Sequence, residues 1–168
     1  MPMMSAAPAF RLPAALLACL LCHSALPAMA ANQWTFEPAE GGFPARAIVW
    51  EKEGFLALSC PDMLAELLVK LPEDGMAERA LLRPRLELLV DDKPPFTGFS
   101  LDEAVSSKAT FRFSVTPEMI NAIQDARNWV NVTIQADEKQ VAEVMFEAEG
   151  TTFSILQFSA HCARPNVE

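Results

Sequence analysis

The chain has no tyrosine, and it has only two histidines, six glycines and four cysteines among 168 residues. Two histidines are too few for a His-rich zinc site. The phosphate-binding patterns G-x-x-x-x-G-K-[ST] and G-x-G-x-x-G are missing, as are the catalytic patterns G-x-S-x-G and H-E-x-x-H. The sequence therefore gives no support to nucleotide binding or to the common hydrolase classes, and it predicts no cofactor.

Long apolar runs are absent after residue 30, and the run at the start of the chain is short. Arg11 is the only Lys, Arg, Asp or Glu among residues 1–30, and a stretch rich in leucine and alanine follows it. An Ala-x-Ala site at residues 28–30 fits signal peptidase, and the run is too short to span a bilayer. We predict a cleavable secretory signal peptide over residues 1–30 and export to the periplasm or the medium, without an integral membrane span.

A lipoprotein signal is the alternative for this segment. Residues 16–19, Leu-Leu-Ala-Cys, would form the lipobox, and Cys19 would carry the lipid. The apolar region would then be very short, and the later Ala-x-Ala site favours the cleaved form.

Acidic residues outnumber Lys and Arg by 22 to 13, and the formal charge is −9. Cleavage removes one charged residue, Arg11, so residues 31–168 carry a formal charge of −10. Such a charge argues against binding to nucleic acid or anionic lipid, which require clustered Lys and Arg. A chain of this length without a linker or repeat predicts a single globular domain over residues 31–168.

Signal cleavage also removes Cys19 and Cys22 and leaves Cys60 and Cys162. In an oxidising compartment we expect these two to pair. Closing a loop of about 100 residues would stabilise the fold by roughly 4 to 5 kcal/mol in the chain-entropy description. The alternative is a reactive thiol at Cys162 with His161 as its base, but adjacent residues of a helix do not face each other.

Alternation of apolar and polar residues predicts seven or eight short strands. They cover residues 33–37, 45–51, 55–60, 85–91, 110–116, 130–136 and 140–148. Residues 63–71 fit two patterns, because the leucines at 64, 67, 68 and 71 have helical spacing while the apolar residues at 65, 67, 69 and 71 alternate. The strand-rich neighbourhood favours a strand there.

Two helices complete the prediction. Thr116-Pro117-Glu118 has an N-cap, a first-turn proline and an acid at the helix start, and this helix should end near Asn128. The second helix follows Gly150 and ends at Arg164. We therefore expect an α+β fold of mostly antiparallel strands, a sandwich or a strongly curved sheet, with two short helices.

One segment is a candidate partner-binding loop. It contains Pro94, Pro95, Phe96 and Phe99, and it combines a rigid turn with two aromatic side chains. Aromatic residues on loops are typical anchors of protein interfaces. A basic patch of Arg79, Arg83 and Arg85 lies nearby in the sequence.

Catalytic groups are few. A Ser-His-Asp triad would have to use His161 with a serine such as Ser106 or Ser154 and an acid such as Asp102. Paired carboxylates for glycosidic chemistry, or oxygen ligands for calcium, would have to come from the acids at 91, 92, 102 and 103. We interpret these acids as solvated loop charges, and His161 as the polar end of a helix.

The layout of the chain resembles a known family. A signal peptide precedes a first strand around Trp34, an early cysteine ends the run at residues 55–60, and a helix after Gly150 carries the second cysteine. This layout is similar to the small secreted Gram-negative proteins of the invasion-associated locus B type, although the further cysteine pair of that family is missing. The resemblance implies a bacterial envelope location and no catalytic role.

We therefore predict a non-enzymatic periplasmic or secreted binding or accessory protein. Its partner would be another envelope or secreted protein, such as a subunit of an envelope or secretion assembly. The alternatives are a small envelope hydrolase that uses His161 and a structural component of the envelope.

The intact mass of the exported protein tests the processing. We expect a chain that begins at Ala31 and lacks both thiol hydrogens of Cys60 and Cys162. A mass that includes residues 1–30, or a lipid attached to Cys19, would contradict this prediction.

Overall fold

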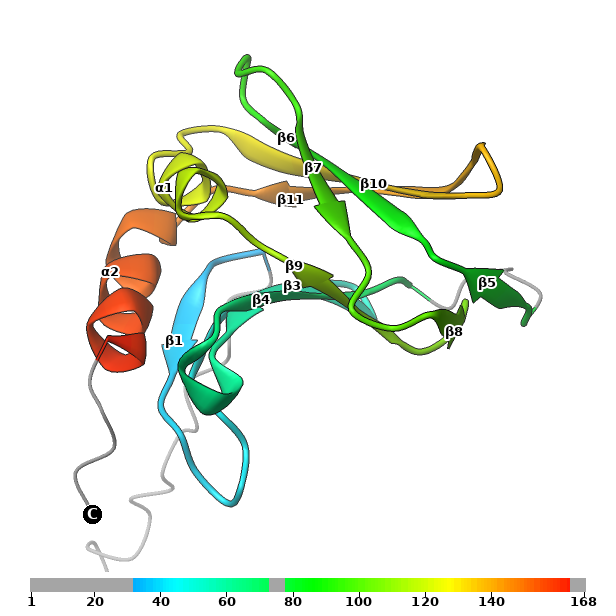
Figure 1. Cartoon of the computed structure of the whole chain (residues 1–168). Coiled ribbons are helices and arrows are strands. Elements are labelled where there is room, and N and C mark those ends of the chain that lie inside the picture. Colours follow the sequence, from blue (N-terminus) through cyan, green and yellow to red (C-terminus); the bar gives the residue numbers. More distant parts are fainter. Residues whose placement is uncertain (1–31, 73–77, 164–168) are drawn as a thin grey trace, which may run out of the picture.

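Two antiparallel sheets lie face to face, with two helices at one end and a small two-stranded sheet at the other (Figure 1). The structure is a computed structural model that describes residues 32–72 and 78–163. The predicted signal peptide and Cys19 lie outside the described residues. Within those residues, no helix is long and apolar enough to cross a membrane.

The five-stranded sheet has the order β1-β2-β3-β4-β9, and the four-stranded sheet has the order β11-β10-β6-β7. The first contains β1 (Thr35–Glu37), β2 (Arg46–Glu51), β3 (Gly54–Ser59), β4 (Glu66–Lys70) and β9 (Thr110–Ser114). The second contains β6 (Arg85–Val90), β7 (Phe96–Phe99), β10 (Trp129–Ala136) and β11 (Lys139–Glu147). The small sheet contains β5 (Ala80–Leu82) and β8 (Ala104–Ser106), and the helices are η1 (Pro61–Met63), α1 (Pro117–Gln124) and α2 (Thr151–Cys162).

The core lies between the two large sheets and is filled by every second residue of their strands. In β10 the residues from Val130 to Ala136 alternate between buried and half-buried, as the period of a pleated strand requires. Phe111 and Phe113 of β9 fill the same space from the opposite sheet and are fully buried. The predicted α+β, mostly antiparallel fold with two helices is confirmed.

Central strand β3 is buried along its whole length. Leu56 and Leu58 belong to the core between the sheets, while Phe55 and Ala57 form a second cluster with Ile48 on the other face. The prediction that residues 55–60 are covered on both faces is confirmed.

The segment 63–71 contains a strand, β4, and not the alternative helix. Leu67 and Val69 point into the core, whereas Leu64 is 75% exposed. A helix would have buried Leu64 with the other leucines, but Asp62 and Met63 have φ angles of 50° and 64°, which no α-helix of L-residues contains. The 3₁₀ turn η1 therefore takes the place of a helix start.

The predicted loop at 94–99 is wrong in part. The turn lies at Asp91 and Asp92, where the Lys93 N–H donates to the Val90 carbonyl. Pro94 and Pro95 follow this turn, and Phe96–Phe99 is strand β7, whose residues pair with β6. This turn reverses the chain after β6, and residues 96–99 then form the edge strand beside it. The short strands β5 and β8 were not predicted either.

The first helix is shorter than predicted, because it ends at Gln124 and not near Asn128. Its start is as expected, since the Thr116 hydroxyl accepts a hydrogen bond from the Met119 N–H. Beyond Gln124, the backbone N–H groups of residues 127–129 donate to the Asp91 carboxylate. These donors are therefore used outside a helix.

Trp34 fastens the start of the described chain to β11 and α2. Its side chain is 2% exposed. Its indole N–H donates to the Glu147 carbonyl at 3.0 Å and its backbone N–H to the Glu149 carbonyl at 2.8 Å. The Trp34 carbonyl accepts from the Ser154 hydroxyl at 3.0 Å. All polar groups of this buried residue thus have partners.

Gly150 makes the close approach of Trp34 possible, and a glycine pair tests this. Gly150 and Gly42 both have a φ of 85°. A Cβ added at Gly150 would lie 2.6 Å from the Trp34 carbonyl oxygen, whereas a Cβ added at Gly42 would have no neighbouring atom within 4 Å. We expect Gly150→Ala to lower the free energy of unfolding by about 1 to 3 kcal/mol more than Gly42→Ala. Urea unfolding measures both. Equal losses would show that the Trp34 contact imposes no constraint.

Candidate functional site

The end of α2 is joined to the end of β3. Cys162 closes the helix, Cys60 directly follows the strand, and their sulfur atoms lie at disulfide distance, as predicted, with the Cα atoms 5.8 Å apart. Ile155 and Phe158 anchor the same helix in the core. The disulfide therefore fixes the C-terminal turn of α2 against the five-stranded sheet.

A hollow of about 300 Å³ lies around this disulfide. A second hollow of about 460 Å³ adjoins it and shares Phe43 and Pro44. We call the two together the disulfide cleft. Its lining residues are Glu37, Pro38, Ala39, Glu40, Gly41, Gly42, Phe43, Pro44, Ala45, Arg46, Cys60, Pro61, Asp62, Met63, His161 and Cys162.

One wall of the disulfide cleft is a tight turn between β1 and β2. Glu40 and Phe43 exchange two backbone hydrogen bonds of 3.2 and 3.0 Å. Gly41 and Gly42 between them have φ angles of 61° and 85°, which glycine adopts without steric cost. This turn holds Phe43 between the two hollows with 70% of its surface exposed.

Another wall is η1, whose residues line the hollow around the disulfide, and Leu64 directly follows η1 outside this lining. Asp62 and Met63 have positive φ angles, and for a methionine this backbone is strained. Met63 is 59% exposed and the neighbouring Leu64 is 75% exposed. Strain that persists in a folded protein often marks a functional segment, and here it accompanies two apolar side chains in solvent.

Carboxylates dominate the charge of the disulfide cleft. Glu37, Glu40 and Asp62 line it, against one guanidinium, that of Arg46. The Arg46 Nε–H donates to Glu37 at 2.6 Å, so this pair is already formed. His161 lies in the wall, and its ring centroid is 6.1 Å from that of Phe36.

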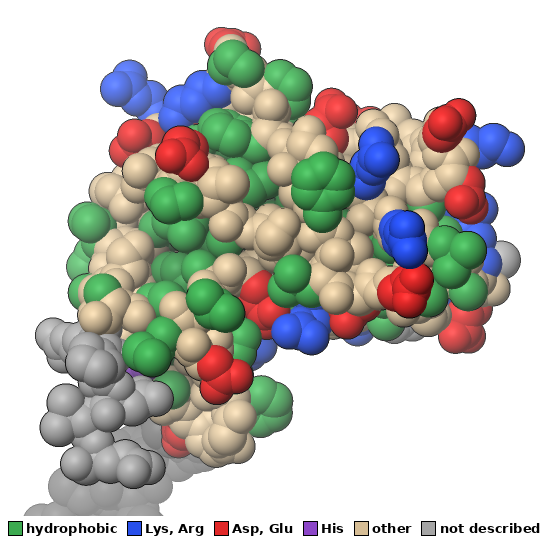
Figure 2. Space-filling model, in the orientation of Figure 1, with side chains coloured by type: hydrophobic (Ala, Val, Ile, Leu, Met, Phe, Trp, Pro, Cys, Tyr) green, Lys and Arg blue, Asp and Glu red, His purple; other side chains and the backbone are tan. Residues whose placement is uncertain are grey.

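The adjoining helix α2 adds an uncharged surface. Its sequence has no Lys, Arg, Asp or Glu, and Phe153 and Leu156 are 68% and 52% exposed. Figure 2 shows hydrophobic and uncharged side chains prevailing over α2, while charged side chains gather above it and at the far end of the molecule.

Sequence reasoning did not find the disulfide cleft. Two signals were available: Phe43 stands between two glycines and a proline, and Leu64 is apolar but out of phase with the buried face of β4. Exposed apolar residues that gather in one place are candidates for a contact surface.

The predicted partner-binding residues do not form one surface. Phe96 packs against the core, and only Phe99 of the two rings is largely exposed, at 59%. The Arg85 guanidinium lies 5.9 Å from the Phe99 ring centroid. Pro94 and Pro95 are exposed at the opposite end of β7 from Phe99.

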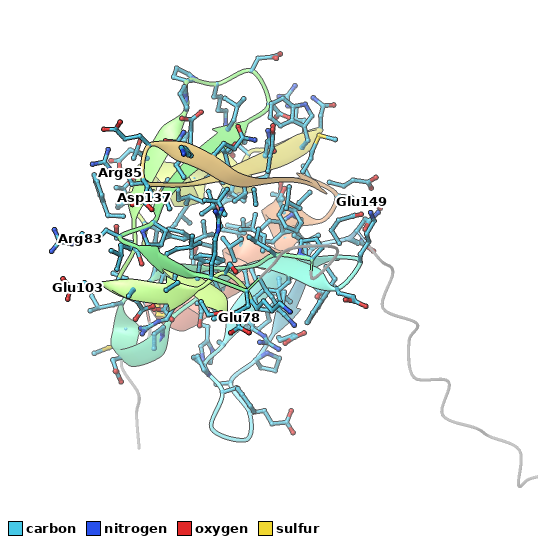
Figure 3. The ribbon with its side chains drawn as sticks, turned by 90° about the vertical axis from the view of Figure 1, so that its right-hand side faces the viewer. Glu78, Arg83, Arg85, Glu103, Asp137 and Glu149 are labelled. Atoms are coloured by element: carbon cyan, nitrogen blue, oxygen red, sulfur yellow. A yellow bond between two sulfur atoms is a disulfide. The ribbon has the colours of Figure 1, made fainter. Side chains whose placement is uncertain are left out.

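The basic patch is interleaved with acids. Arg83 donates to Glu103 at 3.1 Å, and both side chains are about four-fifths exposed. Figure 3 shows Arg83, Arg85, Glu103 and Asp137 gathered along one edge of the molecule. Exposed pairs of this kind contribute little free energy.

The residues of the hypothetical triad do not come together. The Ser154 hydroxyl donates to the Trp34 carbonyl, and the Ser106 hydroxyl donates to Glu78. Asp102 lies beside Arg112, at 3.8 Å. Among the described residues His161 has no hydrogen bond to a serine or an acid, and its contact is the Phe36 ring.

The four acids considered for catalysis or calcium are also separated. Asp91 directly follows the last residue of β6. Asp102 and Glu103 lie near the residues that precede the first residue of β6. The six residues of this strand separate the two groups of acids by roughly 20 Å. In the part of the chain that the structure describes, no three His, Cys, Asp or Glu side chains form a group that could hold a metal ion.

Asp91 is a structural carboxylate and not the solvated loop charge that was predicted from the sequence. It accepts hydrogen bonds of 2.9 to 3.1 Å from the backbone N–H groups of Arg127, Asn128 and Trp129. Partial burial acts to raise the pKa of Asp91, but these hydrogen bonds outweigh it and hold the pKa below its ordinary value. Asp91 thus organises the junction between α1 and β10.

Comparison with known proteins finds no match. No protein-family model matches the chain, and no curated protein or solved structure matches it significantly.

The pH dependence of stability tests the role of Asp91. Because its folded pKa lies below the unfolded value of about 3.9, the ionised group stabilises the fold above that value, and the contribution is lost as the pH falls through the folded pKa. We expect Asp91→Asn to lower the free energy of unfolding by about 1 kcal/mol near pH 7, because solvent screens the site, and by less near pH 3.

Urea unfolding at several pH values measures this difference. Asp92→Asn, which removes an exposed charge at the next residue, is the control and should change little. An Asp91→Asn difference that stays constant down to pH 3 would contradict a role for the ionised carboxylate.

Proposed function

We propose that the protein is an exported, non-enzymatic binding protein that docks a partner protein at the disulfide cleft. The observation that carries the proposal is the exposure of Phe43, Met63 and Leu64, each more than half exposed, on two loops beside one disulfide. The partner is another protein of the bacterial envelope, such as a subunit of an envelope or secretion assembly.

The energetics of burial support this surface. Each large apolar side chain gains roughly 1.5 to 3 kcal/mol when it moves from water into a full apolar contact. Three such side chains could form the small apolar centre on which protein interfaces depend. Two backbone hydrogen bonds between Glu40 and Phe43 fix the turn that carries Phe43, and η1 carries Met63, so little backbone ordering entropy is lost on binding.

Export supports the proposal from a different direction. The predicted signal peptide would send the chain to a compartment that favours disulfides, and Cys60 and Cys162 lie at disulfide distance. An envelope or secreted partner would meet the protein there.

The polar groups favour binding over hydrolysis. A serine nucleophile needs a base within hydrogen-bond reach, but the hydroxyl of Ser154 is engaged with Trp34, and Ser106 is engaged with Glu78. The wall around His161 contains no hydroxyl side chain. Any hydrolytic activity of the purified protein that His161→Ala abolished would contradict the proposal.

Site-specific photo-crosslinking tests the proposed surface. A photo-reactive phenylalanine is placed at Phe43, and in a second variant at Phe99, which is similarly exposed at 59% but lies outside the disulfide cleft. Both are expressed with the signal peptide in the cells that produce the protein. We expect one discrete protein adduct from position 43, identified by mass spectrometry, and none from position 99.

The adduct at position 43 should disappear when Met63→Ser and Leu64→Ser are added, since these changes remove the neighbouring apolar contacts. Adducts from position 99 alone would assign the interface to β7. Adducts from neither position would contradict docking at the disulfide cleft.

A further inference from the structure

We infer that the partner segment that fits the disulfide cleft is basic as well as apolar, with Lys or Arg flanking an apolar side chain. This inference rests on the proposed function, since it gives the chemistry of the partner at the same surface. It is carried by the juxtaposition of unpaired carboxylates with exposed apolar side chains.

The unpaired carboxylates are those of Glu40 and Asp62. Arg46 is already paired with Glu37, since its Nε lies 2.6 Å from the Glu37 Oε2. Among the described residues, the carboxylates of Glu40 and Asp62 have neither a hydrogen bond nor an ion pair, and both residues are exposed. Two negative charges on the walls are therefore available to cations of a partner.

The two carboxylates belong to the two loops that carry the apolar side chains. Glu40 belongs to the turn that carries Phe43, and Asp62 belongs to the segment that carries Met63. A partner chain that places an apolar side chain between Phe43 and Met63 would bring its neighbouring residues to both acids. A guanidinium or ammonium over the exposed Phe43 ring would gain a further cation–π contact.

Charge also discriminates against other occupants. The chain has a formal charge of −9, so a second copy would meet a surface of the same sign, and so would an anionic lipid bilayer. A basic segment is attracted from a distance and then retained by the apolar contact. A basic, apolar protein segment is therefore the occupant that we favour.

Peptide binding with matched charge variants tests the inference. The probes are three fluorescent peptides of equal length, made of leucine and lysine, leucine and glutamate, or serine and lysine. The test variant is Glu40→Gln/Asp62→Asn, in which asparagine keeps the φ of 50° at position 62 accessible. The control variant is Glu53→Gln/Asp92→Asn, which removes one Glu and one Asp outside the disulfide cleft.

We expect the leucine–lysine peptide to bind most tightly. Its affinity should fall roughly fivefold or more in the test variant and less than roughly twofold in the control, and it should fall with rising salt. Equal binding of the leucine–glutamate peptide would overturn the inference. Equal weakening in both variants would do the same, because it would mean that only the total charge matters.

A Phe43→Ser variant separates the inference from the proposed function. If Phe43→Ser weakens peptide binding while Glu40→Gln/Asp62→Asn does not, the disulfide cleft still docks apolar segments, but the basic character of the partner is refuted. If neither change affects binding of any of the three peptides, both the inference and the proposed docking surface fail.

Discussion

The bond between Cys60 and Cys162 is the constraint on which the disulfide cleft depends. It closes a loop across a sequence separation of 102 residues, which corresponds to about 4 to 5 kcal/mol in the chain-entropy description. Its local effect is to hold the last turn of α2 beside η1. Without that link, the wall that contains His161 and the wall that contains Met63 would belong to elements joined only by packing.

Two further sets of hydrogen bonds fix the segments at the ends of the sandwich. Trp34 fastens the strand that leads into the Phe43 turn to β11 and α2. Asp91 fixes the chain between α1 and β10 through backbone N–H groups. The Phe43 turn, η1 and α2 are thus supported by a rigid sheet core, which is why their exposed apolar side chains keep defined positions.

Much of the fold could be predicted from the sequence because strand periodicity is strong in the long strands. The alternation in residues 130–136 and 110–116, and the N-cap at Thr116, gave elements that the structure confirms. Strands β5, β7 and β8 have three or four residues, too few to establish a period. The end of α1 was missed because it depends on Asp91, a residue distant in the sequence.

The disulfide cleft was harder to predict than the fold. The pairing of Cys60 with Cys162 followed from a count of cysteines after signal cleavage, yet nothing in that count shows which side chains surround the bond. Phe43 and Met63 are 20 residues apart in numbering, yet both line the hollow around the disulfide. By contrast, the predicted loop at 94–99 had the composition of an interface, but Phe96 packs against the core and only Phe99 is largely exposed.

Amide hydrogen exchange of the oxidised and the reduced protein tests most directly whether the disulfide organises this surface. The account predicts that reduction speeds exchange in the C-terminal turn of α2 and around Leu64, while the central strands β6 and β10 keep their protection. Unchanged exchange at these sites would contradict it, and so would an equal increase in every strand, which would make the bond a contributor to global stability alone.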